Sequence, residues 1–177
     1  MKNLISKSDS IFVAGHHGLA GSAICRALKK FGYKNILTVS RKELDLRDQF
    51  KVKNWFKGNS PDIVILAAAK VGGILANSIY PYDFIIENIQ IQTNVIEAAF
   101  QNSVKRLLFL SSSCAYPKKC TQPIREEYLL SNYLEKTNEN YALAKIVGMK
   151  FCEALRKQKK FDAFSLMPTN LYGPNDN

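Results

Sequence analysis

The stretch Ile11-Phe12-Val13-Ala14-Gly15-His16-His17-Gly18-Leu19-Ala20-Gly21 decides the fold of this chain. Its first four residues form a short apolar run, which predicts a buried strand. Residues 22–31 then carry apolar side chains at a helical period. A Gly-x-x-Gly-x-x-Gly loop therefore lies between a strand and a helix, where the pyrophosphate of a dinucleotide rests on a helix N-terminus.

The three glycines of this loop each have an expected task. Gly15 permits the tight turn, Gly18 lets the backbone approach a phosphate, and Gly21 lets the helix pack closely on the strand. A glycine-rich pattern alone is weak evidence, since a plain structural turn can look the same. Its position between strand and helix favours a dinucleotide site.

Strands and helices alternate along the rest of the chain. Apolar runs predict further strands at 35–40, 62–67, 105–110 and 161–167, and helical periods predict helices at 49–57, 82–102 and 139–159. Ala68 to Pro81 and 117–138 are expected to be loops, and the length of the second favours a functional loop. The sequence thus predicts one α/β domain over 1–177, a Rossmann-type doubly wound parallel sheet with strand order 3-2-1-4-5.

Two polar constellations follow predicted strands and suggest catalysis at a carbonyl. The run Ser111-Ser112-Ser113-Cys114-Ala115-Tyr116-Pro117 follows the strand at 105–110, at the sheet edge where ligands bind. Tyr141 and Lys145 are four residues apart on a helix and share a face, so the ammonium can lower the phenol pKa. Each pattern has a plain alternative, an ordinary serine-rich turn and an aromatic contact beside a solvated lysine.

Composition excludes several classes of protein. The 177 residues carry a net charge of +10, but the basic residues are dispersed, and the densest run, 156–160, ends a predicted helix. We therefore expect no nucleic-acid partner, although a positive field attracts anionic nucleotides.

No apolar run approaches 20 residues and the first nine residues are too polar for a signal peptide, so we expect a cytoplasmic protein without a membrane partner. The four cysteines form no Cys-x-x-Cys pair and the two histidines are adjacent, so we expect no metal.

The end of the second predicted strand indicates the cofactor. It reads Val39-Ser40-Arg41-Lys42, without the carboxylate that often holds a ribose 2′-OH. Arg41 can instead contact a 2′-phosphate through two N–H groups. The sequence favours NADP over NAD.

Taken together, these motifs resemble the extended short-chain dehydrogenase/reductase family over nearly the whole chain, from Phe12 to Asn177. The most specific stretches are 15–18, 67–74, 112–117 and 167–174. Within the family, the chain is similar to the NADPH-dependent epimerase/reductases that act on a GDP-sugar, GDP-4-keto-6-deoxy-mannose, in nucleotide-sugar biosynthesis. The alternative is another nucleotide-sugar epimerase or dehydratase, against which Cys114 argues, because those enzymes typically carry a hydroxyl or carboxyl residue nearby.

The resemblance implies a role for each site residue. Tyr141 donates a proton to the C4 oxygen as hydride arrives, Lys145 lowers the Tyr141 pKa and holds the nicotinamide ribose, and Ser112 hydrogen-bonds the substrate oxygen. Cys114 matches the base that removes protons at C3 and C5. The implied cofactor contacts are Gly15, His17, Gly18, Leu19, Gly21, Arg41, Asp45, Leu46, Ala67, Ala69, Lys70, Tyr141, Lys145, Pro168, Asn170 and Leu171.

The chain departs from the family pattern at two places. His17 stands where an arginine usually helps to bind the 2′-phosphate. The sequence also stops at Asn177, before the family's catalytic histidine and its C-terminal substrate domain. We therefore expect that domain to be missing and the chain alone to be inactive, or merely a dinucleotide-binding fragment. The resemblance further implies a homodimer in which helices 82–102 and 139–159 form a four-helix bundle, with a stripe of Ile86, Ile89, Thr93 and Ile96 in the core or the interface.

Overall fold

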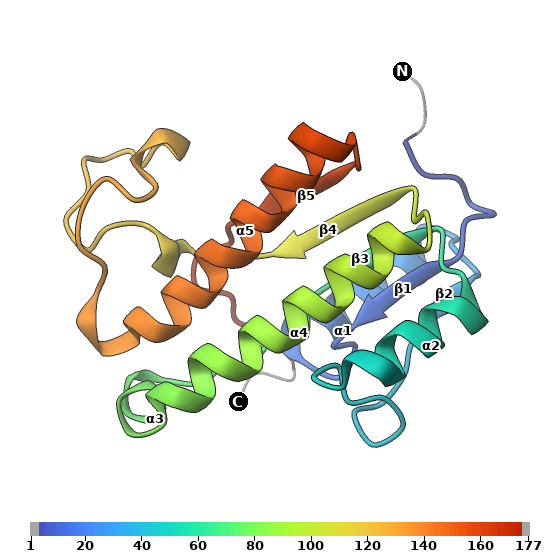
Figure 1. The fold of residues 1–177 in the computed structure, drawn as a ribbon, viewed down its shortest axis with the longest axis horizontal. Coiled ribbons are helices and arrows are strands. Elements are labelled where there is room, and N and C mark those ends of the chain that lie inside the picture. The colour runs from blue at the N-terminus through green and yellow to red at the C-terminus, as the bar shows by residue number, and fades with distance from the viewer. Residues whose placement is uncertain (1–3, 175–177) are drawn as a thin grey trace.

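The computed structural model describes residues 4–174 and shows a parallel sheet covered by helices (Figure 1). The expectations that concern the first residues and the end at Asn177 reach positions outside this range. No helix in the described range is both long enough and apolar enough to cross a bilayer.

The helices and strands alternate as the sequence predicts. They are β1 (Ile11–Ala14), α1 (Leu19–Lys30), β2 (Ile36–Leu37), α2 (Gln49–Asn59), β3 (Ile63–Leu66), α3 (Ile74–Ile79), α4 (Pro81–Gln101), β4 (Arg106–Leu110), α5 (Glu139–Lys159) and β5 (Ala163–Leu166). Two details differ from expectation. The second strand has only two residues, and the expected loop between β3 and α4 contains α3. The 117–138 segment is irregular, as expected, apart from short 3-10 turns.

The doubly wound parallel sheet is confirmed, but the predicted strand order is wrong. The observed order is β2-β1-β3-β4-β5, so β3 pairs with β1 rather than lying outside β2. The pairing from Ile11–Ile63 to Ala14–Leu66 gives β1 four paired residues on this side, against two on the β2 side. In the sheet, β1 therefore has β2 on one side and β3 on the other. The carboxyl ends of these strands frame the crevice in which ligands of such sheets bind.

Side chains of β1 alternate between the two faces of the sheet, as the strand period requires. Phe12 belongs to the larger apolar cluster under α2, α4 and α5, and its ring lies 4.2 Å from Trp55 and 5.8 Å from Phe56, measured between ring centroids. Ile11 and Val13 pack on the opposite face, where α1 lies (Figure 1). Both faces of the sheet centre are therefore covered, and β1 is completely buried.

Three buried amides on α4 tie the surrounding segments together. Asn88 accepts a hydrogen bond from the backbone N–H of Lys70 (2.9 Å) and donates to the carbonyls of Lys70 (3.0 Å) and Phe84 (2.7 Å). Gln92 donates to the carbonyl of Ala144 on α5 (2.6 Å). Asn94 donates to the carbonyls of Leu46 and Arg47 (both 2.9 Å). One helix thus holds the loop after β3, the segment after β2, and α5.

The apolar stripe predicted on α4 divides between core and surface. Ile96 is completely buried, whereas Ile86, Ile89 and Thr93 are half-buried. On α5, which runs beside α4, Leu143 is 38% exposed and Val147 is 45% exposed. The two long helices therefore share an outer surface with apolar side chains.

Candidate functional site

The glycine loop is shaped by close contacts that exclude side chains. Gly15 has a positive φ of 88°, and a Cβ there would lie 2.6 Å from the backbone nitrogen of Ala68. A Cβ on Gly21 would lie 2.1 Å from the carbonyl oxygen of Gly15. The loop consequently lies directly against the end of β3 and brings α1 to the sheet. Gly21 acts by letting α1 approach the loop itself, a refinement of its predicted role against the strand.

The N-terminus of α1 opens toward this loop. Gly18 is the N-cap residue, and the first turn carries no acidic side chain. The first N–H groups of a helix have no partner within the helix and sit at the positive end of its dipole. The first turn of α1 is therefore able to bind a phosphate group through its backbone.

A cleft of about 900 Å³ runs along the carboxyl edge of the sheet, from the end of β2 to the end of β5. All sixteen residues with an implied cofactor contact line it. They are Gly15, His17, Gly18, Leu19 and Gly21 from the glycine loop; Arg41, Asp45 and Leu46 after β2; Ala67, Ala69 and Lys70 after β3; Tyr141 and Lys145 on α5; and Pro168, Asn170 and Leu171 after β5. Ser112 also lines the cleft, and Cys114 is not among its lining residues.

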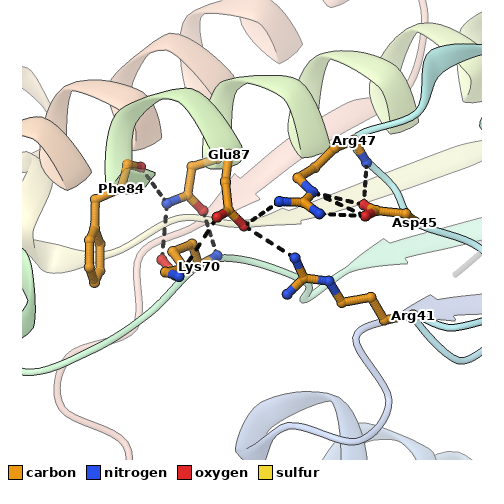
Figure 2. A network of polar contacts seen from close by, with 7 residues as sticks. Arg41, Asp45, Arg47, Lys70, Phe84 and Glu87 are labelled. Atoms are coloured by element: carbon orange, nitrogen blue, oxygen red, sulfur yellow. Dashed lines mark hydrogen bonds and ion pairs between the residues drawn. The ribbon is translucent and has the colours of Figure 1, made fainter. Parts of the chain in front are cut away.

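Charged side chains gather at the β2 end of the cleft (Figure 2). Arg47 donates to both carboxylate oxygens of Asp45, at 2.6 to 3.1 Å, and these bonds lower the Asp45 pKa to about 2. Glu87, from α4, contacts Arg41, Arg47 and Lys70. Arg41 is 67% exposed along its side chain, so it can reach a ligand in the cleft.

The rings of the two histidines of the glycine loop are in contact, with centroids 3.9 Å apart and planes tilted by 41°. Burial lowers the pKa of His16, and its Nδ1 is buried without a hydrogen-bond partner. His17 is exposed at the cleft. Among the residues that line the cleft, the cations beside these histidines are Arg41, Arg47 and Lys70.

At the other end of the cleft, Lys145 is buried under the end of β4. Its Nζ donates to the carbonyl of Leu110 (2.7 Å) and lies 4.8 Å from the ring centroid of Phe109. The side chain is 4% exposed, and burial lowers its pKa to about 8. The Tyr141 ring centroid lies 5.7 Å from the same nitrogen, so the two residues share one face of α5 as their spacing predicts.

Tyr141 carries a perturbed phenol. Burial, followed by the charge on Cys114, raises its pKa to about 12, and the hydrogen bond with Ser112 opposes that shift. The Lys145 ammonium donates its hydrogen bond to the carbonyl of Leu110, and Ser112 is the group that lowers the Tyr141 pKa by a hydrogen bond. Tyr141 therefore stays protonated at neutral pH, which is the form a proton donor needs.

Cys114 lies on the loop that follows β4. Its backbone N–H donates to the Ser112 hydroxyl (3.3 Å), and its Sγ accepts a hydrogen bond from Asn138 Nδ2 (3.3 Å). The backbone N–H groups of Ser111 and Ser113 donate to the carbonyls of Leu166 (2.9 Å) and Pro168 (3.1 Å). The loops after β4 and β5, which the sequence analysis singled out separately, are thus joined into one wall.

Three residues of the site were missed by the sequence analysis. Asn138 donates a hydrogen bond to Cys114, and Arg47 forms an ion pair with Asp45. Glu87 forms ion pairs with three cationic side chains. The Asp-x-Arg spacing of 45 and 47 is a readable local signal, as is an asparagine just before the helix that carries Tyr141. Glu87 has no such signal, because its partners come from segments far apart in the sequence.

The chain belongs to the NAD dependent epimerase/dehydratase family, whose model matches residues 11–177. It is 57% identical over 177 residues to GDP-L-fucose synthase 1 of Arabidopsis thaliana and 53% identical over 167 residues to GDP-L-fucose synthase of Escherichia coli K12. These matches cover 100% and 94% of the chain but only 55% and 52% of the relatives. The chain thus spans about half the length of the curated relatives it matches.

Solved structures agree with this placement. MlghC, a GDP-mannoheptose C4 reductase from Campylobacter jejuni with NADP bound, superposes with a TM-score of 0.94 at 39% identity. A GDP-L-fucose synthetase from Naegleria fowleri bound to NADP superposes with a TM-score of 0.85 at 31% identity. Each match covers 98% of this chain and 55% or 57% of the solved one.

The burial of Lys145 predicts that the stability of the native chain relative to the variant Lys145→Met depends on pH. Its folded pKa of about 8 lies below the ordinary 10.5, so its charge destabilises the fold below pH 8. That cost disappears between pH 8 and 10.5, where the unfolded chain holds the proton and the folded chain does not. Relative to Lys145→Met, the native chain should gain about 3 kcal/mol of unfolding free energy across this range, measured by urea denaturation.

The control for this measurement is Lys157→Met, which removes an exposed lysine from the same helix. Its difference from the native chain should stay flat with pH. If the difference in unfolding free energy between the native chain and Lys145→Met also stayed constant with pH, the Lys145 ammonium would not be destabilised by burial.

The contact between Asn138 and Cys114 predicts a change in thiol reactivity. Asn138→Ala removes the hydrogen bond to the sulfur, so the thiolate loses a donor and alkylation of Cys114 by iodoacetamide at pH 7 should slow about fivefold. Mass spectrometry of the Cys114 peptide measures the rate, and the exposed Asn132→Ala provides the control. An unchanged rate in Asn138→Ala would show that the contact does not act on the thiolate.

Proposed function

We propose that the chain is the dinucleotide-binding half of an NADPH-dependent epimerase/reductase that converts GDP-4-keto-6-deoxy-mannose to GDP-L-fucose. One observation carries the proposal. In a chain 57% identical to a GDP-L-fucose synthase, all sixteen implied cofactor residues line a single cleft that ends at Tyr141 and Lys145.

The residues of the cleft fit a dinucleotide. The glycine loop is closed to side chains at Gly15 and Gly21, and the adjacent helix N-terminus is free of acids. The volume of about 900 Å³ lies at the upper end of the range for small-molecule and cofactor sites. When bound, NADPH supplies the hydride for reduction of the ketone. The protein's part is to bind and orient the cofactor and to move protons at the sugar.

The geometry at the end of β4 supports a division of the proton chemistry among three side chains. Tyr141 is protonated and donates to the oxygen of the ketone as negative charge develops there, and Ser112 hydrogen-bonds the same oxygen. Cys114 acts as the base that removes the protons at C3 and C5, because a thiolate is a better base at neutral pH than a hydroxyl group. Burial, followed by charge on the Cys114 sulfur, raises the Tyr141 pKa to about 12, which favours the protonated phenol.

Cofactor selection is assigned to the β2 end. Arg41 is exposed there and contacts a single carboxylate, so it is free to turn toward a 2′-phosphate. Arg47 is held by Asp45 and fixes the segment that faces the adenine. We also place the protein in the cytoplasm, where its four unpaired cysteines would stay reduced.

Titration of the chain with NADPH and NADH tests the dinucleotide proposal. The native chain should bind NADPH at least about tenfold more tightly, since a guanidinium–phosphate contact is charge-assisted and bidentate. Arg41→Ala should lose most of that preference while binding NADH as before. Lys42→Ala, the exposed neighbour, is the matched control. Equal affinity of the native chain for both cofactors would refute the NADP assignment.

The role of Cys114 is tested in the protein that carries both halves. Cys114→Ser should slow the exchange of the C3 and C5 hydrogens with solvent deuterium by at least about 100-fold. Reduction of an already epimerised ketone should continue. Mass spectrometry of the sugar product follows the exchange. Deuterium entering both positions at the native rate would assign the base elsewhere.

We further propose a homodimer through α4 and α5. The supporting observation is the outer surface of these helices, with Leu143 and Val147 exposed beside half-buried isoleucines of α4. Light scattering at micromolar concentration should give a dimer for the native chain and a monomer for Val147→Glu, because a charge in an apolar interface is costly to bury. Phe50→Glu, on the exposed side of α2, should remain dimeric. A monomeric native chain would refute the dimer.

A further inference from the structure

Glu87 is the common partner of three cations at the β2 end of the cleft (Figure 2). Its carboxylate lies 3.5 Å from Arg41 Nη2, 3.3 Å from Arg47 Nη1 and 3.7 Å from Lys70 Nζ. The Glu87 side chain is 14% exposed, so these contacts are partly shielded from water. Shielding strengthens the contacts with Arg47 and Lys70, whose side chains are 34% exposed, more than the contact with Arg41, whose side chain is 67% exposed.

The three cations are not equivalent. Arg47 is already committed to Asp45 through Nε and Nη2. Within residues 4–174, Arg41 and Lys70 have an ion pair only with Glu87. The five side chains carry three positive and two negative charges, which leaves a single positive charge for an incoming anion. Arg41 is therefore shared between Glu87 and any anion that enters the cleft beside it.

Glu87 is held firmly in this position. The next residue along α4, Asn88, is buried and ties the backbone of Lys70 to the helix through two hydrogen bonds. These bonds keep the backbone of Lys70 beside the turn of α4 that carries Glu87. Arg41, by contrast, has an exposed side chain, and its one contact to Glu87 is at the long end of the hydrogen-bond range. When an anion enters the cleft, Arg41 is the partner that turns away.

We propose that Glu87 is a specificity-determining residue that limits the preference of this cleft for a dinucleotide with a 2′-phosphate. The inference rests on the dinucleotide function proposed above. In the free protein Glu87 holds Arg41, and a 2′-phosphate must draw Arg41 away from it. A phosphate with a charge of about −1.5 to −2 is also repelled by the nearby carboxylate. A dinucleotide without the 2′-phosphate meets neither cost.

Glu87→Gln tests the inference, because it keeps the shape of the side chain and removes its charge. The dissociation constants of NADP⁺ and NAD⁺ are measured by calorimetry in a phosphate-free buffer at moderate salt. We expect NADP⁺ to bind about three- to tenfold more tightly to Glu87→Gln, a range typical of one nearby charge, with NAD⁺ changed less than about twofold. Glu97→Gln makes the same charge change on the same helix outside the cleft and should alter neither.

Glu87→Asp provides a second variant if loss of the charge impairs folding. It keeps the charge but withdraws the carboxylate from Arg41 by one methylene, so NADP⁺ binding should strengthen by a smaller factor than in Glu87→Gln. Circular dichroism checks that each variant is folded before titration.

The outcomes separate this inference from the proposed function. If the native chain binds NADP⁺ and the folded variants bind it no more tightly, Glu87 does not compete for Arg41 and the inference is overturned alone. Weaker NADP⁺ binding by the variants would likewise overturn it, since Glu87 would then orient Arg41 for the phosphate. If the native chain binds neither dinucleotide, the proposed function fails and this inference fails with it.

Discussion

The cleft depends on the buried amides of α4. Asn88, Gln92 and Asn94 lie within two turns of one helix, and each hydrogen-bonds backbone groups of a different segment. An amide that loses its partners in a buried position costs about 1–3 kcal/mol, so the three segments are held in one arrangement with the helix. The loop after β3, the segment after β2, and α5 supply three walls of the cleft. The positions of Lys70, Asp45 and Lys145 all follow from this constraint.

Burial acts on the two residues at the reacting end in a consistent way. It lowers the Lys145 pKa to about 8 and raises the Tyr141 pKa to about 12, so it favours the neutral form of each. Tyr141 is thereby kept in its protonated form. The Lys145 ammonium donates a hydrogen bond to the carbonyl of Leu110 at the end of β4, which ties α5 to the strand that precedes Ser112 and Cys114.

Local patterns in the sequence predicted most of the fold. The apolar runs located the strands, the helical periods located the long helices, and the glycine loop located the cleft, because each pattern is set by neighbouring residues. The strand order was predicted incorrectly, since the choice of β1 as the partner of β3 depends on pairing between distant segments. The same limit applies to α3, a six-residue helix without a strong period.

The candidate site divides in the same way. Tyr141, Lys145 and the serine-rich loop carry readable spacings, and Arg41 is readable from its place after a strand. The place of Asn138 just before a helix is also readable, but the role of Glu87 is visible only once the chain is folded, because its partner Arg41 is 46 residues away. Polar contacts between distant segments determine the charge and the hydrogen bonding at the two ends of the cleft, and no short motif encodes these contacts.

Amide hydrogen exchange with and without NADP⁺ tests whether this cleft holds the dinucleotide. We expect added protection in the first turn of α1, in the segment 41–47 after β2 and in the segment 67–73 after β3, with α2 and the 117–138 segment unchanged. Protection that is absent from the first turn of α1, or that is confined to segments outside the cleft, would contradict it.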